Sequence, residues 1–163
     1  MAAEIERKFL VADDRWRASV IRSERLRDGL ISRFGGGKVR VRLGEGRAWI
    51  AVKGPRRGIS RSEYEYEIPI ADAEEMLATL CTGPLLEKVR HCVPHAGLIW
   101  SVDVHRGALE GLIMAEVELS SEGVEVAIPE WIGREVTGDP QFKREALFAR
   151  YAAPAFAELA ART

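Results

Sequence analysis

Charged and apolar residues alternate with a period of two along several short segments, and this alternation constrains the fold more than any other feature of the chain. In an extended strand, residues i and i+2 point to the same face and lie about 6.5–7 Å apart. Glu4, Glu6 and Lys8 therefore share one face of the first segment, whereas Ile5 and Phe9 lie on the other. The same pattern recurs along most of the sequence and predicts a mainly β protein.

Glycine and proline separate these segments at close spacing, so the expected strands are short and joined by hairpin-length loops. We expect strands at 3–11, 30–34, 38–44, 47–53, 60–68, 85–93, 98–106 and 112–120, and a ninth at 123–128. We expect helices from Asp13-Asp14 through Val20, from Asp72 through about Leu80, and at 140–151 and 154–162. Such strands predict one antiparallel sheet that curls or closes, and about eight of them can form a barrel whose interior holds a ligand. Trp49, Trp100 and Trp131 are expected to pack on the outside of this barrel, against helices.

The length and composition indicate a single domain over residues 1–163, because no linker, repeat or low-complexity segment interrupts the chain. The chain has 24 Lys and Arg against 25 Asp and Glu, and this balance argues against nucleic acid and anionic membranes as partners. Apolar runs are too short to span a bilayer, and the charged N-terminus lacks the apolar region of a signal peptide. Two cysteines without a Cys-x-x-Cys motif predict neither a disulfide framework nor a zinc site. We therefore expect a reduced, cytoplasmic protein.

The charges on any one strand face mostly share one sign. The pairs are Glu4 and Glu6, Arg40 and Arg42, Glu63 and Glu65, Lys88 and Arg90, and Glu116 and Glu118. One interpretation is a solvated face, since antiparallel sheets commonly expose one face to water. However, like charges side by side destabilise a sheet, and a face selected for solubility would mix the signs. The segregation therefore favours a second interpretation, in which cations neutralise the carboxylates and an anion neutralises the basic residues.

A polyphosphate with divalent metal ions would meet both requirements. Arginine binds phosphate oxygens through two parallel hydrogen bonds, and lysine binds them as a point charge. Carboxylates supply the oxygen ligands that Mg²⁺ and Mn²⁺ prefer. The residues alone thus favour a barrel with a charged interior that binds a metal–phosphate ligand. Without metal, Glu116 and Glu118 are expected to repel each other and the Glu4–Glu6 pair.

The segment Glu4-Ile5-Glu6-Arg7-Lys8 resembles the Glu-x-Glu-x-Lys signature of the CYTH domain, or triphosphate tunnel metalloenzyme, family. Further segments resemble the family in its own order and cover nearly the whole chain. They are Arg40-Val41-Arg42, Lys53-Gly54, Arg61-Ser62-Glu63-Tyr64-Glu65-Tyr66-Glu67-Ile68-Pro69, Glu87-Lys88-Val89-Arg90, Trp100-Ser101-Val102-Asp103, Ala115-Glu116-Val117-Glu118-Leu119 and Trp131-Ile132-Gly133-Arg134-Glu135-Val136-Thr137.

This resemblance implies an eight-stranded antiparallel closed barrel with short flanking helices and C-terminal helices, which binds a triphosphate along its axis. It implies metal-dependent hydrolysis of the terminal phosphoanhydride, with inorganic tripolyphosphate giving pyrophosphate and phosphate. The implied catalytic residues are Glu4, Glu6, Lys8, Glu116 and Glu118. The implied substrate-binding residues are Lys8, Arg40, Arg42, Lys53, Glu63, Glu65, Lys88 and Arg90. The implied ligands of two Mg²⁺ or Mn²⁺ ions are Glu4, Glu6, Asp103, Glu116 and Glu118.

Departures from the family pattern leave the choice of triphosphate open. Asp28-Gly29-Leu30 stands where many bacterial relatives carry Gln-Gly-Tyr, and Phe142 and Arg144 stand where relatives often have Tyr and Asn. The alternatives are hydrolysis of ATP, other nucleoside triphosphates or thiamine triphosphate, or a non-catalytic binder of polyphosphate or nucleotides. The absence of the His-Phe element of the cyclase branch disfavours adenylate cyclase. The expected partner is a small-molecule triphosphate, and the sequence does not distinguish a monomer from a homodimer.

Overall fold

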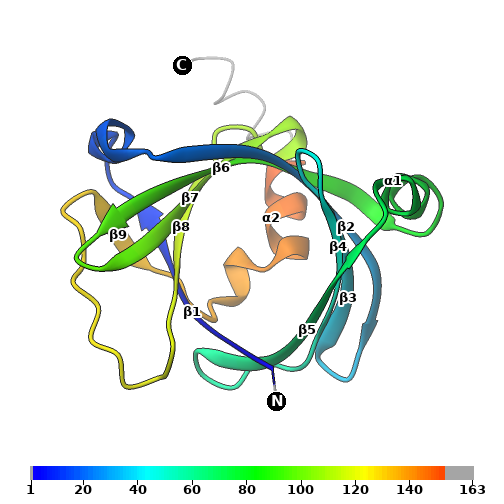
Figure 1. The fold of residues 1–163 in the computed structure, drawn as a ribbon, viewed down its shortest axis with the longest axis horizontal. Coiled ribbons are helices and arrows are strands. Elements are labelled where there is room, and N and C mark those ends of the chain that lie inside the picture. Colours follow the sequence, from blue (N-terminus) through cyan, green and yellow to red (C-terminus); the bar gives the residue numbers. More distant parts are fainter. Residues whose placement is uncertain (1, 153–163) are drawn as a thin grey trace.

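Eight antiparallel strands form a closed ring, which Figure 1 shows end-on. The computed structural model describes residues 2–152, so the helix expected at 154–162 lies outside the described residues. In chain order the strands are β1 (Ala3–Val11), β2 (Arg22–Phe34), β3 (Gly37–Leu43), β4 (Ala48–Lys53), β5 (Ser60–Ile68), β6 (Thr82–His95), β7 (Leu98–Arg106) and β8 (Ile113–Glu118). Around the ring they follow the order β5-β4-β3-β2-β6-β7-β8-β1, and β1 pairs with β5 to close it. The predicted antiparallel barrel is confirmed.

Strand β1 closes the barrel by pairing with different neighbours along its length. Residues 3–5 pair with β5, and residues 6–10 pair with β8. The end of β1 also pairs with a short outer strand, β9 (Ile132–Glu135), which the sequence analysis did not predict. The strand predicted at 123–128 is wrong, because β7 and β1 already occupy both edges of β8. Val124 and Val126 pack instead against the apolar outer face of the barrel.

Strand β2 begins at Arg22, eight residues before the start that the sequence predicted. Its first half carries charges on both faces, because Glu24 and Asp28 share the inner face while Arg25 and Arg27 are exposed outside. A segment with charges on both faces lacks the apolar alternation that indicates a strand.

Helices are few and flank the ring. The segment expected to be helical through Val20 forms the 3₁₀ helix η1 (Arg15–Ser19), and the helix expected from Asp72 is α1 (Ile70–Thr79). The helix expected at 140–151 divides into the 3₁₀ helix η3 (Pro140–Phe142) and α2 (Arg144–Tyr151), and a further 3₁₀ turn, η2 (Gly107–Leu109), follows β7. None of the helices of residues 2–152 is long and apolar enough to span a membrane.

Most apolar side chains of the strands point outward, so the main hydrophobic core lies outside the barrel. On one side, Trp100 and Trp131 are buried together with Trp16, and the two rings of Trp100 and Trp131 meet edge to face at 5.9 Å. On the other side, helix α1 covers Val41 and Leu43 of β3. The positions predicted for Trp100 and Trp131 on the outside are confirmed. This arrangement leaves the inner face to polar residues.

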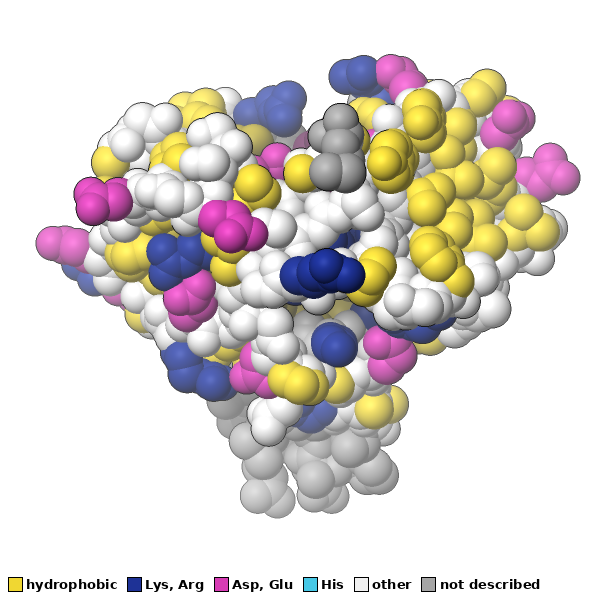
Figure 2. All heavy atoms as spheres, turned by 90° about the horizontal axis from the view of Figure 1, so that it is seen from below, with side chains coloured by type: hydrophobic (Ala, Val, Ile, Leu, Met, Phe, Trp, Pro, Cys, Tyr) yellow, Lys and Arg dark blue, Asp and Glu magenta, His cyan; other side chains and the backbone are white. Residues whose placement is uncertain are grey.

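The prediction for Trp49 is wrong, because Trp49 lies opposite Arg42 in the β3–β4 register and faces inward with it. The outer face of β4 and β5 is instead apolar and exposed, with Val52, Tyr64 and Tyr66 accessible to solvent. Figure 2 shows apolar side chains gathered on the right of the face seen from below.

Candidate functional site

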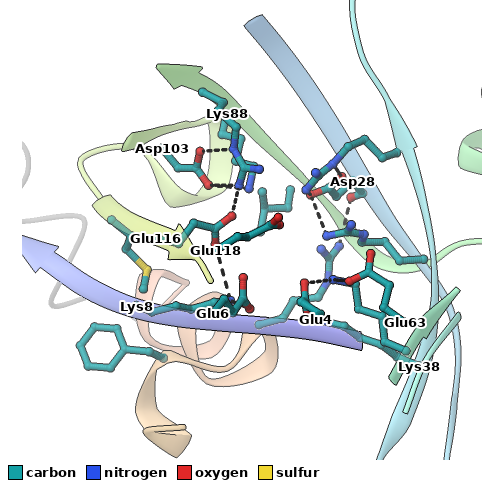
Figure 3. Close-up of a pocket in the computed structure, with 18 of the residues that line it drawn as sticks. Glu4, Glu6, Lys8, Asp28, Lys38, Glu63, Lys88, Asp103, Glu116 and Glu118 are labelled. Carbon is teal, nitrogen blue, oxygen red and sulfur yellow. Dashed lines mark hydrogen bonds and ion pairs between the residues drawn. The ribbon is translucent and has the colours of Figure 1, made fainter. Parts of the chain in front are cut away.

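A cavity of about 340 Å³ runs inside the barrel, and charged side chains from every strand of the ring line it. Figure 3 shows these side chains pointing inward from facing walls. The lining contains eight carboxylates and nine lysine or arginine side chains. The carboxylates are Glu4, Glu6, Asp28, Glu63, Glu65, Asp103, Glu116 and Glu118, and the cations are Lys8, Lys38, Arg40, Arg42, Lys53, Arg61, Lys88, Arg90 and Arg144. All the residues that the sequence analysis assigned to the site line this one cavity.

Three carboxylates form the acidic trio of the cavity, namely Glu4 and Glu6 on β1 and Glu118 on β8. One oxygen from each lies within 4.8 Å of the others. Strand pairing produces this cluster, because Glu6 lies directly opposite Glu118 in the β1–β8 register. Burial and the nearby charges of Glu116, Glu6 and Glu4 raise the pKa of Glu118. An all-oxygen, net-negative cluster of this kind fits a hard divalent cation such as Mg²⁺ or Mn²⁺.

Lysine and arginine side chains partly neutralise Glu4. Lys53 Nζ lies 2.7 Å from Glu4 Oε1, and Arg61 Nε donates to Glu4 Oε2 at 2.5 Å. Burial opposes the charge of Glu4, but Lys53 and Arg61 outweigh it and hold the pKa of this carboxyl below its usual range. Its neighbour Glu63 is different, because burial and a hydrogen bond with Glu4 raise the pKa of Glu63 to about 7.

Asp103 and Glu116, which the resemblance assigned to the metal, lie outside the acidic trio and are held by basic residues. Lys88 Nζ lies 2.6 Å from Asp103 Oδ2, and Arg90 donates to both oxygens of Asp103 at 2.8 Å. Arg90 also forms a short ion pair with Glu116. Burial disfavours the charged form of Glu116, but Arg90 and Lys8 outweigh it and lower its pKa to about 2. Basic residues of the cavity therefore hold both of these carboxylates.

Strand β3 supplies a basic wall that includes residues outside the predicted set. Arg42 donates two hydrogen bonds, of 2.7 and 2.9 Å, to the buried carboxylate of Asp28 on β2. Arg40 also lines the cavity, and its buried Nε has no hydrogen-bond partner among the described residues. Burial, together with Arg61 and Arg40, lowers the pKa of Lys38 to about 7.

Some lining residues were missed by the sequence analysis for identifiable reasons. Arg61 lies two residues before Glu63 on β5, so the period-two rule applied one step further would have placed it inside. Asp28 was missed because the first half of β2 was not recognised as a strand. Arg144 comes from helix α2 and donates to the carbonyl of Pro84 at 2.5 Å, a tertiary contact that leaves no local signal.

The two ends of the cavity differ. Helix α2 lies within the outline of the ring in Figure 1, and Phe142, Arg144 and Leu147 line the cavity at that end. Beyond Arg42 and Arg90, the other end continues into a hollow of about 550 Å³. Its walls are more apolar and include Trp49, Leu98 and Ile99. A linear, highly charged ligand thus has a long polar channel with one wider mouth.

Comparison with known proteins agrees with this geometry. A sequence model of the CYTH domain matches residues 2–152. The inorganic triphosphatase of Acetivibrio thermocellus is 44% identical over 142 residues, which are 87% of this chain and 90% of that protein. The inorganic triphosphatase of Nitrosomonas europaea is 35% identical over 149 residues, 88% of this chain and 95% of that protein. The crystal structure of an inorganic triphosphatase superposes with a TM-score of 0.63 at 30% identity and covers 90% of this chain and 95% of that chain.

The residues that the family motifs assign to the site all line one cavity, and both the sequence and the fold match over nearly the full length. The chain belongs to the CYTH domain family.

Proposed function

We propose that this protein is a metal-dependent inorganic triphosphatase that cleaves the terminal phosphoanhydride of tripolyphosphate to give pyrophosphate and phosphate. The observation that carries the proposal is one cavity in which the acidic trio faces basic residues from several strands. The names of the two curated relatives support the same reaction, since both are inorganic triphosphatases.

The basic residues would bind and orient the phosphates. Phosphoryl transfer depends mainly on positioning and on stabilising charge, and both are supplied by fixed guanidinium and ammonium groups. Arg40 offers the unpartnered Nε, and Arg42 and Arg90 are already oriented by Asp28 and Asp103. The lining carries only one more cation than carboxylate. A bare triphosphate would therefore give the cavity a large net negative charge. A triphosphate complexed with divalent metal would keep the net charge of the cavity closer to zero.

The acidic trio would hold Mg²⁺ or Mn²⁺, and a bound ion would screen the phosphoryl charge and lower the pKa of a bound water. Glu4, Glu6 and Glu118 supply the oxygen ligands for one ion. Asp103 and Glu116 are paired with Lys88 and Arg90, so the second ion expected from the family resemblance stays a prediction that metal stoichiometry tests.

Organic triphosphates form a second candidate class of substrate. The hollow at the wider mouth lies next to Arg42 and Arg90, and its Trp49, Leu98 and Ile99 side chains could contact a base or another organic group attached to the triphosphate. The same cavity would then cleave ATP or thiamine triphosphate, with the organic group outside the polar channel.

Phosphate release from tripolyphosphate, pyrophosphate, ATP and thiamine triphosphate, each with Mg²⁺, Mn²⁺ or EDTA, tests the proposal. We expect tripolyphosphate with metal to react fastest, and pyrophosphate to react poorly because it spans fewer of the basic strands. Arg40→Gln should lower kcat/KM about ten- to a hundredfold, the effect of one lost charged hydrogen bond. The exposed Arg25, on the outer face of the same barrel, provides the matched control Arg25→Gln. Pyrophosphate turnover faster than that of tripolyphosphate would contradict the proposal.

The other expectations from the sequence stay predictions. They are a single domain over residues 1–163, a cytoplasmic location, and a monomer or homodimer in solution. Sedimentation of the purified chain would distinguish the two oligomeric states.

A further inference from the structure

Arg56 reaches from a loop onto the acidic trio. The loop of residues 54–59 connects β4 to β5, and its Arg56 Nη2 lies 2.8 Å from Glu6 Oε1 and 3.7 Å from Glu4 Oε2. Arg56 Nη1 also donates to the carbonyl oxygen of Ile59 at 3.2 Å, which anchors the guanidinium over the carboxylates. The side chain of Glu6 is only 3% exposed, so this contact neutralises a nearly buried charge. A cation of the chain itself thus lies on two of the three carboxylates of the acidic trio.

Arg56 differs from the other cations at these carboxylates in how the backbone holds it. Lys8, Lys53 and Arg61 belong to β1, β4 and β5, whose ladder hydrogen bonds fix them in the ring. Arg56 lies outside the ladder, in a loop that contains Gly54 and Gly58, and Gly58 has a positive φ of 61°. Its side chain is 20% exposed, whereas that of Lys53 is 4% exposed. Arg56 can therefore leave the carboxylates without breaking the barrel.

We propose that Arg56 is a tethered cation that occupies the acidic trio in the metal-free protein and is displaced when a divalent ion binds. The Glu6 carboxylate both accepts the Arg56 hydrogen bond and belongs to the acidic trio, so a guanidinium and a metal ion compete for this carboxylate. The guanidinium and the metal ion are both positively charged, so their mutual repulsion also disfavours binding of both at once. Arg56 is thus a positioning residue that sets the affinity of the site for metal. The inference rests on the metal dependence proposed above.

The competition predicts opposite effects of one substitution on two measurable properties. Without metal, Arg56→Gln leaves Glu6 short of a partner and should lower the melting temperature. With metal, the same substitution removes a competitor and should tighten binding. Because stability and binding are linked, the loss of stability should shrink as the metal concentration rises to saturation. A residue with only a structural role would lower stability equally with and without metal.

The experiment is a calorimetric titration of the substrate-free protein with Mn²⁺ at fixed ionic strength, together with melting curves in EDTA and at saturating Mn²⁺. Arg57→Gln is the matched control, since Arg57 is the exposed neighbour in the same loop and the change in net charge is identical. We expect Arg56→Gln to bind Mn²⁺ about tenfold more tightly, as for one lost charged hydrogen bond, and Arg57→Gln to stay within about twofold of the wild type. Glu118→Gln should weaken Mn²⁺ binding strongly, which assigns the measured heat to the acidic trio.

Unchanged or weaker Mn²⁺ binding by Arg56→Gln would overturn the inference, as would an equal gain in affinity in Arg57→Gln. An equal loss of stability with and without Mn²⁺ would also overturn it. If the wild-type protein binds no Mn²⁺, the proposed metal dependence itself fails. If the wild type binds Mn²⁺ and Arg56→Gln binds it no more tightly, only the role of Arg56 fails.

Discussion

Glu116 and Glu118 lie two residues apart on one face of β8, yet their neighbours affect their charges in opposite directions. Arg90 and Lys8 approach Glu116 and lower its pKa to about 2, against the effect of burial. Glu118 lies beside Glu116 on β8 and opposite Glu6 of β1, and burial together with the charges of Glu116, Glu6 and Glu4 raises its pKa. The sequence analysis predicted that the two residues are equivalent and repel each other. The difference arises from cross-strand partners, which residue spacing along one strand does not reveal.

Substitution by glutamine should therefore change the melting temperature differently at these two carboxylates. Glu118→Gln removes an unfavourable charge, so its metal-free melting temperature should equal or exceed that of the wild type. Glu116→Gln removes a favourable partner of buried Arg90 and should lower the melting temperature. Both variants should lose triphosphatase activity. Melting curves in EDTA beside a phosphate-release assay provide the measurement, and a Glu118→Gln protein less stable than Glu116→Gln would contradict the assignment.

Lys38 should take up a proton when the triphosphate binds. Its pKa is lowered to about 7 by burial and by Arg61 and Arg40, so much of it is neutral at pH 8. Between a pH of about 7 and 10.5, Lys38 is mostly neutral in the folded protein but protonated in the unfolded chain. Because the unfolded chain binds more protons in this window, the contribution of Lys38 to the free energy of unfolding increases as the pH rises. A bound polyanion favours the ammonium form and reverses the shift.

Calorimetric titration with tripolyphosphate at pH 8, in two buffers that differ in ionisation enthalpy, measures this uptake. We expect an uptake of up to about one proton at pH 8, a smaller uptake at pH 6, and loss of most of it in Lys38→Gln. Identical binding heats in the two buffers at pH 8 would show that Lys38 does not titrate in this way.

At the scale of the elements, period-two alternation predicted the strands wherever one face is apolar and the other charged, as in β1, β3 and β5. It failed where pairing depends on distant partners. β9 is a short strand on the edge of β1 that β5 pairs only as far as Ile5, and the segment 123–128 alternates but forms no strand. Which strand edges remain free to pair with a further strand depends on how the whole ring is assembled, so it cannot be inferred from one segment.

Gly29 on β2 shows how closely helix α1 and the residues after it approach the barrel. A Cβ atom at this position would lie 2.3 Å from Cys81 Sγ and 2.7 Å from Leu77 Cδ2. Gly29→Ala should therefore push the segment 77–81 off the sheet and cost about 1–3 kcal/mol of unfolding free energy, as overpacking of a core does. Urea unfolding measures the loss. Gly123→Ala, where no atom lies within 4 Å of the added Cβ, is the control and should be nearly neutral.

At the scale of the whole molecule, the main hydrophobic core lies outside the ring of strands and a cluster of charges lies inside it. The sequence predicts this arrangement once the strands are known to form a closed barrel. Same-sign pairs on single strands predicted a charged interior, and all the residues so assigned line one cavity. The ion pairs within the cavity were not predictable, because Asp28–Arg42, Asp103–Lys88 and Glu4–Lys53 join residues of different strands. These pairs, with nine cations and eight carboxylates in the lining, bring the interior close to neutrality.

A nearly neutral interior predicts that metal and triphosphate bind cooperatively. Triphosphate alone would bring excess negative charge into a cavity that already holds eight carboxylates, and metal alone would bring positive charge beside nine cations. Together they compensate each other, so each should increase the affinity for the other by an equal factor. At a hundredfold excess over Kd, the complex should stabilise the fold by about 2.7 kcal/mol. Melting curves with Mn²⁺, with tripolyphosphate and with both ligands measure the coupling, with tripolyphosphate in large excess so that turnover does not deplete it during the scan. Glu118→Gln is the metal-deficient control. The shift with both ligands should exceed the sum of the separate shifts in the wild type and fall to that sum in Glu118→Gln. Additive shifts in the wild type would mean that the cavity does not balance charge between the two ligands.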